Sequence, residues 1–186
     1  MSGDPGYLPG TDIPRFLRKQ MEFVGLGEAE VAVIRRTAPV VLRHEAAITA
    51  ALYEHFLRFP DTARFFLGED GAPDLERLER RKHSLGRWLR ESAEAITTQE
   101  FAYYLLAVGL SHSHREHGPD GRVPPHFMVG AISLTQTALA RIFHAELDPE
   151  TAGAATHAWN KLLLVHLSVL LLGYLPSPRP APPSAS

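Results

Sequence analysis

Apolar residues recur at helical spacing along most of the chain, and short stretches rich in proline, glycine and acidic residues separate them. In the clearest run, Phe101, Tyr104, Leu105, Val108 and His112 occupy positions i, i+3, i+4, i+7 and i+11. This spacing places side chains on one face of an α-helix. No stretch alternates apolar and polar residues in the manner of a half-buried strand. The pattern predicts an all-α protein of about seven helices.

Residues that start and stop helices set the expected boundaries. Thr97 stands three residues before Glu100, the spacing of a capping box, so a helix is expected to begin there and to end near Glu116. Pro39 is expected to interrupt one helix and to start a longer one that reaches about Phe59. The remaining helices are expected at residues 15–24 and 28–36, after Pro73-Asp74, after Pro124-Pro125, and from Asp148 to about Gly173.

The predicted helices form one domain, which is expected to cover residues 25–175. Residues 1–24 form an N-terminal extension with a short helix that is expected to be ordered by packing on the main body. Residues 176–186 hold five prolines and no large apolar residue, so they are expected to form a disordered tail.

Charge and cysteine content narrow the possible functions. Lys and Arg number 19 against 21 Asp and Glu, so the formal net charge is −2. This balance provides no global attraction for nucleic acid or for an anionic membrane surface. Because the chain has no cysteine, it has no disulfide, no thiolate nucleophile and no cysteine-ligated metal. A metal ion would have to be held by histidine or carboxylate.

Neither a membrane span nor a secretion signal is expected. The most apolar stretch, residues 162–175, contains His166 and Ser168 and is shorter than the roughly 20 residues of a membrane span. The first residues lack the basic start and apolar run of a signal peptide. A soluble, cytoplasmic protein is the expectation.

Histidine is the residue type that suggests chemistry. Four of the ten histidines, His112, His114, His117 and His126, lie in or beside one loop, a cluster that could ligate a divalent transition metal. The loop has no His-Glu-x-x-His helix, and its spacing matches no specific metal site. His112 continues the apolar face, whereas His114 is rotated by about 200° from it. A lone inward histidine is more often a hydrogen-bonded core residue than a ligand, so periodicity alone favours a structural role for His112.

Five segments, in order, resemble the protoglobins, single-domain relatives of the globin domains of globin-coupled sensors. They cover the chain from about Gly6 to Leu175. The segments are Tyr53-Glu54-His55-Phe56 with Phe59-Pro60 and Phe65-Phe66; residues 69–74; Arg81-Lys82 with Gly86-Arg87-Trp88-Leu89; Val108-Gly109-Leu110-Ser111-His112; and Val123-Pro124 with Phe127 and Ala131.

The resemblance implies a globin-like fold that binds haem b, with His112 as the protein ligand to the iron. It also implies that Tyr53 can donate its hydroxyl to a bound gas, and that Leu85 stands where the family often has phenylalanine. Arg81 is expected to point to solvent or to a haem propionate. The other implied haem-contacting residues are Phe56, Phe66, Trp88, Tyr104, Leu105 and Val108, and no catalytic residue is assigned.

The expected function is therefore reversible binding of O₂, CO or NO for gas sensing, binding or detoxification. An alternative is a haem enzyme, either an NO dioxygenase or a peroxidase-like protein, which needs a separate reductase because the chain has no Gly-x-Gly-x-x-Gly motif. A sensor that signals in trans to a partner and a helical scaffold without haem are further alternatives.

A homodimer through the last two helices is also expected. These two helices, the one from Pro124 to His144 and the last one, carry more apolar surface than one small core needs, and related globins pair through them as a four-helix bundle. The residues on which this expectation depends are Leu163, His166, Leu167, Leu170 and Leu171.

Overall fold

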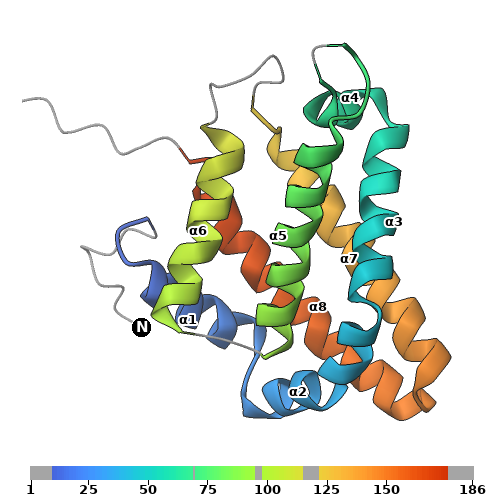
Figure 1. The fold of residues 1–186 in the computed structure, drawn as a ribbon. Helices are drawn as coiled ribbons and strands as arrows, with labels where there is room; N and C mark the ends of the chain where they lie inside the picture. The colour runs from blue at the N-terminus through green and yellow to red at the C-terminus, as the bar shows by residue number, and fades with distance from the viewer. Residues whose placement is uncertain (1–9, 69, 95–97, 115–121, 176–186) are drawn as a thin grey trace, which may run out of the picture.

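The computed structural model describes residues 10–68, 70–94, 98–114 and 122–175, and their regular secondary structure is helical apart from one bridge between Leu67 and Pro73. The all-α prediction is confirmed. The helices are α1 (Ile13–Val24), α2 (Glu28–Arg43), α3 (Glu45–Arg58), α4 (Pro60–Ala63), a 3₁₀ turn (Arg64–Phe66), α5 (Leu75–Ala93), α6 (Gln99–Ser113), α7 (Pro125–Glu146) and α8 (Pro149–Leu172) (Figure 1).

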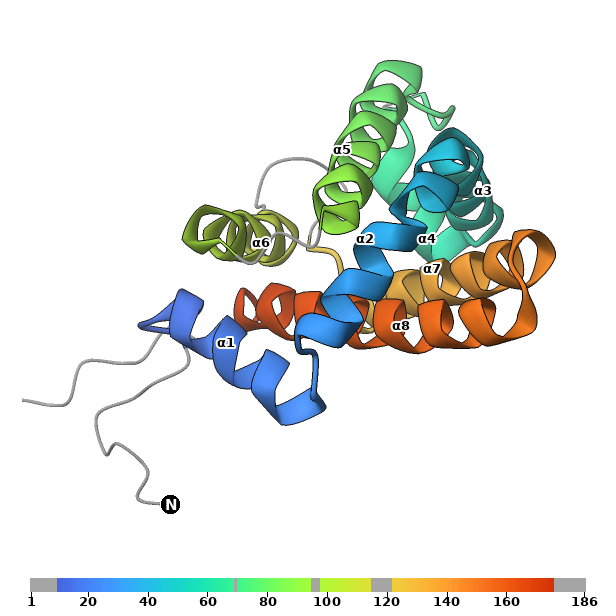
Figure 2. The same ribbon diagram turned by 90° about the horizontal axis from the view of Figure 1, so that it is seen from below.

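Helix α8 is the centre of the fold. It contacts α1, α2, α6 and α7, and it lies antiparallel beside α7. Seen from below, α3 and α5 stand on one side of the α7–α8 pair and α1 lies on the other (Figure 2). By length and composition α8 could cross a membrane, but about half of it is buried inside the protein, as in the core helix of a globular domain.

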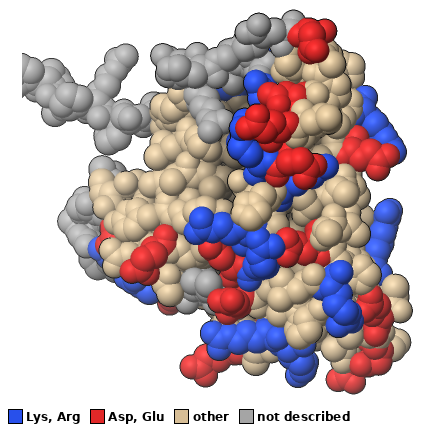
Figure 3. All heavy atoms as spheres, viewed as in Figure 1, with Lys and Arg blue, Asp and Glu red and all other residues tan. Residues whose placement is uncertain are grey.

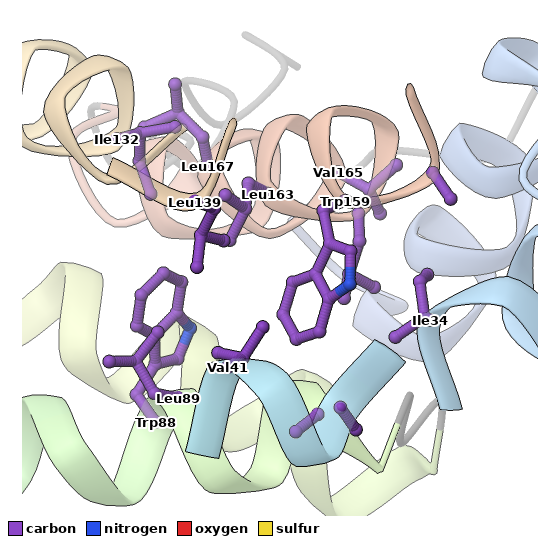
Figure 4. Packing of buried hydrophobic residues seen from close by; sticks show 14 of the residues in the cluster. Ile34, Val41, Trp88, Leu89, Ile132, Leu139, Trp159, Leu163, Val165 and Leu167 are labelled. Carbon is purple, nitrogen blue, oxygen red and sulfur yellow. The ribbon is translucent and has the colours of Figure 1, made fainter. Parts of the chain in front are cut away.

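The core forms where α7 and α8 face α2 and α5. The indole rings of Trp88 and Trp159 point into the space between these two helix pairs (Figure 4). Trp159 is almost fully buried, and its Nε1 donates to Thr37 Oγ1 at 3.0 Å. The ring is therefore buried with its N–H paired. An unpaired N–H in the core would destabilise the fold.

The predicted helix starts after residue 73, after residue 124 and at Asp148 are confirmed. Asp74 accepts a hydrogen bond from the amide of Arg77 at 2.9 Å, and Asp148 accepts one from the amide of Thr151 at 3.0 Å. These side chains pair with amides that the first turn of a helix cannot pair itself. Pro125 occupies the first position of α7, where its missing N–H has no cost.

The predicted break at Pro39 is wrong. Helix α2 continues through Pro39 to Arg43, and the chain breaks at His44 instead. Pro39 is exposed, so the hydrogen bond that its ring removes leaves a backbone carbonyl in contact with water. Glu146, at the end of α7, binds both His44 and Arg43, the latter at 2.6 Å. A contact between distant segments thus accompanies the break.

The start of α6 also differs by one residue. Thr98 is the N-cap, and its Oγ1 accepts from the amide of Phe101 at 3.3 Å. Helix α6 ends at Ser113, so His112 stands in its last turn. The expected cap Thr97, the expected end at Glu116 and the expected disordered tail at 176–186 lie outside the described residues.

Candidate functional site

A cavity of about 210 Å³ opens between α3 and α5 on one side and α6 and α7 on the other. The 3₁₀ turn and Leu170 of α8 complete its wall. Eight of the nine residues predicted to contact haem line it: Tyr53, Phe56, Phe66, Leu85, Trp88, Tyr104, Val108 and His112.

Leu105 is the predicted residue that does not line the cavity. It has no exposed surface and belongs to the hydrophobic core. On α6, Tyr104, Val108 and His112 follow each other at intervals of four residues and face the cavity, whereas Leu105 is rotated by about 100° from Tyr104. The apolar face of α6 therefore divides into a cavity side and a core side, and the spacing of apolar residues does not distinguish them.

The residues that α7 contributes to the cavity were not among the haem contacts predicted from the sequence. Met128, Ile132 and Thr135 recur at i, i+4 and i+7 and form one wall together with Phe127 and Ala131. The signal was present in this spacing, but it is equally typical of an ordinary core face.

His112 is held in a defined tautomer. Its Nδ1 lies 2.7 Å from the carbonyl oxygen of Val108. A carbonyl only accepts hydrogen bonds, so the proton must be on Nδ1, and the neutral ring then carries a lone pair on Nε2. The Ser111 hydroxyl donates to the same carbonyl at 2.8 Å, and the Val123 amide donates to the His112 carbonyl at 3.0 Å. A metal-binding histidine uses this arrangement.

Tyr53 brings a hydrogen-bond donor into the cavity. Its side chain is only 8% exposed and packs edge-on against Phe66 and Phe56, at ring-centroid distances of 5.4 and 5.7 Å. Burial raises the pKa of Tyr53 to about 12, although the positive charge of Arg81 acts in the opposite direction. The hydroxyl therefore keeps its proton at neutral pH.

Arg81 and Ser84 form the polar edge of the cavity on α5. Arg81 stands one turn before Leu85 on the same side of the helix and is half-buried. Its guanidinium can pair with a carboxylate of a bound group. Over α5 the surface carries charges of both signs, whereas the surface over α6 carries few (Figure 3).

The alternative of a divalent metal site in the histidine cluster finds no support in the part of the chain that the structure describes, where no three His or carboxylate groups converge. His114 is exposed and bonded to the Ser113 hydroxyl at 2.6 Å, and His126 is exposed beside Phe127. His117 lies outside the described residues.

His166 is buried in the core, not in the cavity wall. It packs against the rings of Trp88 and Phe101, with centroids 6.1 and 5.1 Å away. Burial lowers its pKa to about 3, so the ring is neutral.

The donor set of the cavity fits an iron porphyrin. Most of the lining is apolar or aromatic, which suits a flat hydrophobic ring system. One imidazole in the lining, that of His112, carries its lone pair on Nε2 when the ring is neutral, which is the form that binds iron, and the Tyr53 hydroxyl makes no hydrogen bond within the described residues. Arg81 is placed for a carboxylate.

Comparisons with known proteins agree with the all-helical fold. A family model described as Protoglobin matches residues 15–178. The globin domain of a Geobacter sulfurreducens globin-coupled sensor is similar with a TM-score of 0.71 and 16% identity, covering 84% of this chain and 96% of that one. The ferrous globin domain of E. coli DosC has a TM-score of 0.64 and 14% identity, covering 82% and 97%. Its ferric form gives 0.63 and 12%, covering 83% and 99%. No curated protein matches the chain.

Proposed function

The chain belongs to the protoglobin family, and from this premise we propose that it is a haem protein that reversibly binds a diatomic gas, O₂, CO or NO, with His112 as the iron ligand. One observation carries the proposal. The Nδ1–H of His112 is bonded to the Val108 carbonyl, so the neutral ring carries its lone pair on Nε2, in a residue that lines a largely apolar cavity. A histidine with a purely structural role, such as His166, packs within the core and not against a cavity.

Different residues of the chain would hold different parts of the haem group. When bound, haem b supplies an iron atom with a coordination position open to a gas. The aromatic and aliphatic walls exclude water from the porphyrin, and Arg81 at the edge suits a propionate. Tyr53 remains protonated and can donate a hydrogen bond to a polar ligand in the cavity.

Haem reconstitution tests the proposal directly. We expect the purified chain to take up one haem per protomer with a Soret band, and the reduced protein to bind CO and release it unchanged. Absence of a Soret band after reconstitution would favour a helical scaffold without haem. Sustained NO consumption in the presence of an added reductase would indicate the haem enzyme instead of a binding protein.

Tyr53→Phe should speed the release of O₂. One hydrogen bond between neutral groups contributes about 0.5–1.5 kcal/mol, which corresponds to a roughly 2- to 10-fold faster O₂ dissociation rate. Stopped-flow displacement of O₂ by CO measures this rate. Tyr103→Phe is the matched control, because Tyr103 is exposed on α6 and does not line the cavity. Equal O₂ dissociation rates for wild type and Tyr53→Phe would show that Tyr53 donates no hydrogen bond to bound O₂.

The sequence argument for a homodimer needs correction. Leu163, His166, Leu167 and Leu170 are buried in the chain's own core. They therefore supply no surplus surface for a second copy. Packing of α8 against four other helices uses the apolar surface that the sequence pattern had attributed to an interface.

We nevertheless propose a homodimer through α7 and α8, which rests on other residues. Val129 on α7 and Leu164 on α8 remain 48% and 43% exposed. A hollow of about 120 Å³ lies between the two helices, where the side chains of Gln136 and Asn160 are hydrogen-bonded at 2.6 Å. Two such helix pairs would form a symmetric four-helix bundle.

Light scattering during size-exclusion chromatography tests the dimer. Leu164→Glu should shift the wild-type dimer to a monomer, since a carboxylate buried at the interface would have no partner. Phe23→Glu is the control, because Phe23 is exposed and belongs to α1, not to α7 or α8. A wild-type monomer at micromolar concentration contradicts the proposal.

A further inference from the structure

The backbones of α6 and of the C-terminal end of α8 come into contact at two glycines, Gly109 in α6 and Gly173, the residue that follows α8. A Cβ atom added to Gly109 would lie 2.9 Å from the carbonyl carbon of Leu170 and still closer to its oxygen. A Cβ atom added to Gly173 would lie 2.6 Å from both the carbonyl carbon of Gly109 and the amide nitrogen of Leu110. The two backbones are therefore in direct contact, and neither position has room for a methyl group.

This contact lies one turn before His112. Gly109 precedes His112 by three residues and lies on the core side of α6, four residues after Leu105, next to the cavity side that carries His112. Beyond His112, the Ser113 hydroxyl donates to the carbonyl of Gly173 at 2.5 Å. The backbone on both sides of His112 is thus attached to the end of α8, while the Val108 carbonyl orients its ring.

Other helical glycines of the chain do not show this crowding. Gly130 on α7 and Gly153 on α8 have no atom within 4 Å of an added Cβ. At Gly86 an added Cβ would meet the flexible end of the Glu45 side chain, which can move away. Backbone atoms cannot retreat in this way, so a methyl group at Gly109 or Gly173 has to push the helices apart.

We propose that the contact between Gly109 and Gly173, together with the Ser113 hydrogen bond, positions the His112 imidazole in the cavity and so sets the strength of its bond to the haem iron. The inference rests on the proposed function, in which His112 binds the iron. Gly109, Gly173 and Ser113 are positioning residues in this account, since none of them is assigned a contact with the iron.

The test compares Gly109→Ala and Gly173→Ala with Gly153→Ala in the full chain loaded with haem. Resonance Raman spectra of the ferrous, gas-free protein report the iron–histidine stretching band. We expect the band to shift in the first two variants and to stay in place in Gly153→Ala. Haem transfer to an acceptor globin should be about 10-fold faster in the first two, the lower end of what changes around a metal ligand cost.

A second variant covers the case in which an added methyl group prevents folding. Ser113→Ala adds no atom and removes only the hydroxyl, which is bonded to the Gly173 carbonyl and to Nδ1 of His114. It should shift the same band in the same direction by a smaller amount. Thermal unfolding followed by circular dichroism identifies a purely structural role, which would lower the melting temperature and leave the band unmoved.

Haem-free protein separates this inference from the proposed function. In ¹⁵N-histidine NMR spectra, the Nδ1–H tautomer of His112 should be present in wild type and in Gly153→Ala and be mixed with the other tautomer in Gly109→Ala, Gly173→Ala and Ser113→Ala. Absence of an iron–histidine band in wild type would refute the proposed function. The tautomer comparison between the variants would still test whether the glycine contact positions the His112 ring. Unchanged band and unchanged tautomer in all three variants would overturn the inference.

Discussion

We expect His112→Ala to fold but to hold haem more than about 100-fold more weakly than wild type, a loss beyond the 10–100-fold that changes around a metal ligand cost. The fold survives because the core side of α6 is formed by Phe101, Ala102 and Leu105, which the substitution leaves intact. Haem titration measures the affinity. Added imidazole should restore part of it, since the missing ring leaves space beside Val108 for a free ligand.

The control for this experiment is His114→Ala, because His114 is exposed in the next turn. It should bind haem as tightly as wild type does. A five-coordinate spectrum that persists in His112→Ala and disappears in His117→Ala would assign the ligand to the loop after α6. The globin fold would stand in that case, and the register of the site would be wrong.

The second large effect concerns His166 and the pH dependence of stability. His166 is 1% exposed, and its Nδ1 lies 3.5 Å from the Ser92 hydroxyl, which itself donates to the Trp88 carbonyl. Burial is the sole cause of its lowered pKa of about 3. A histidine in the unfolded chain has a pKa of about 6.5.

The sign of the effect follows from these two pKa values. Between pH 6.5 and 3 the unfolded chain binds a proton at His166 and the folded chain does not, so acid favours unfolding. The free energy of unfolding should fall by about 1.4 kcal/mol per pH unit in this range, or about 2 kcal/mol at pH 5. Above pH 7 the residue makes no such contribution.

Urea unfolding of haem-free protein at pH 7.5 and pH 5.0 measures this difference. His166→Leu should abolish the loss of unfolding free energy that His166 causes between these two pH values. His157→Leu, at an exposed position on the same helix, should leave that loss unchanged. The pKa values of Glu146 and Asp148 are lowered by hydrogen bonds, so their contributions are lost at still lower pH. The same pH dependence in wild type and His166→Leu would show that the folded core accepts the proton.

The sequence predicted most helix starts because each depends on residues next to it. An aspartate or proline before an apolar run acts locally, as at Asp74, Asp148 and Pro125. The break at His44 was missed because it coincides with a contact with Glu146, about a hundred residues away in the chain. No local signal reports such a contact.

The residues of the site were likewise predicted only in part. Periodicity placed His112 on an apolar face but favoured a core role, and only the ordered resemblance to a family indicated a ligand. Nothing in the spacing separates Leu105, which faces the core, from Tyr104, which faces the cavity. Arg81 was expected at the solvent side or at a propionate, and its position in the lining follows from how α5 packs on α3.

The contact between α1 and α8 joins the first and the last of the described helices, and it bears on the order of events during synthesis. Ile13 and Leu17 of α1 are buried, yet helix α8, against which α1 packs, is synthesised after every other described helix. Long-range contacts of this kind form late in folding. Leu170, near the end of α8, also closes the cavity wall. A nascent chain that lacks α8 therefore has no complete pocket, and under the proposed function we expect haem capture to require α8.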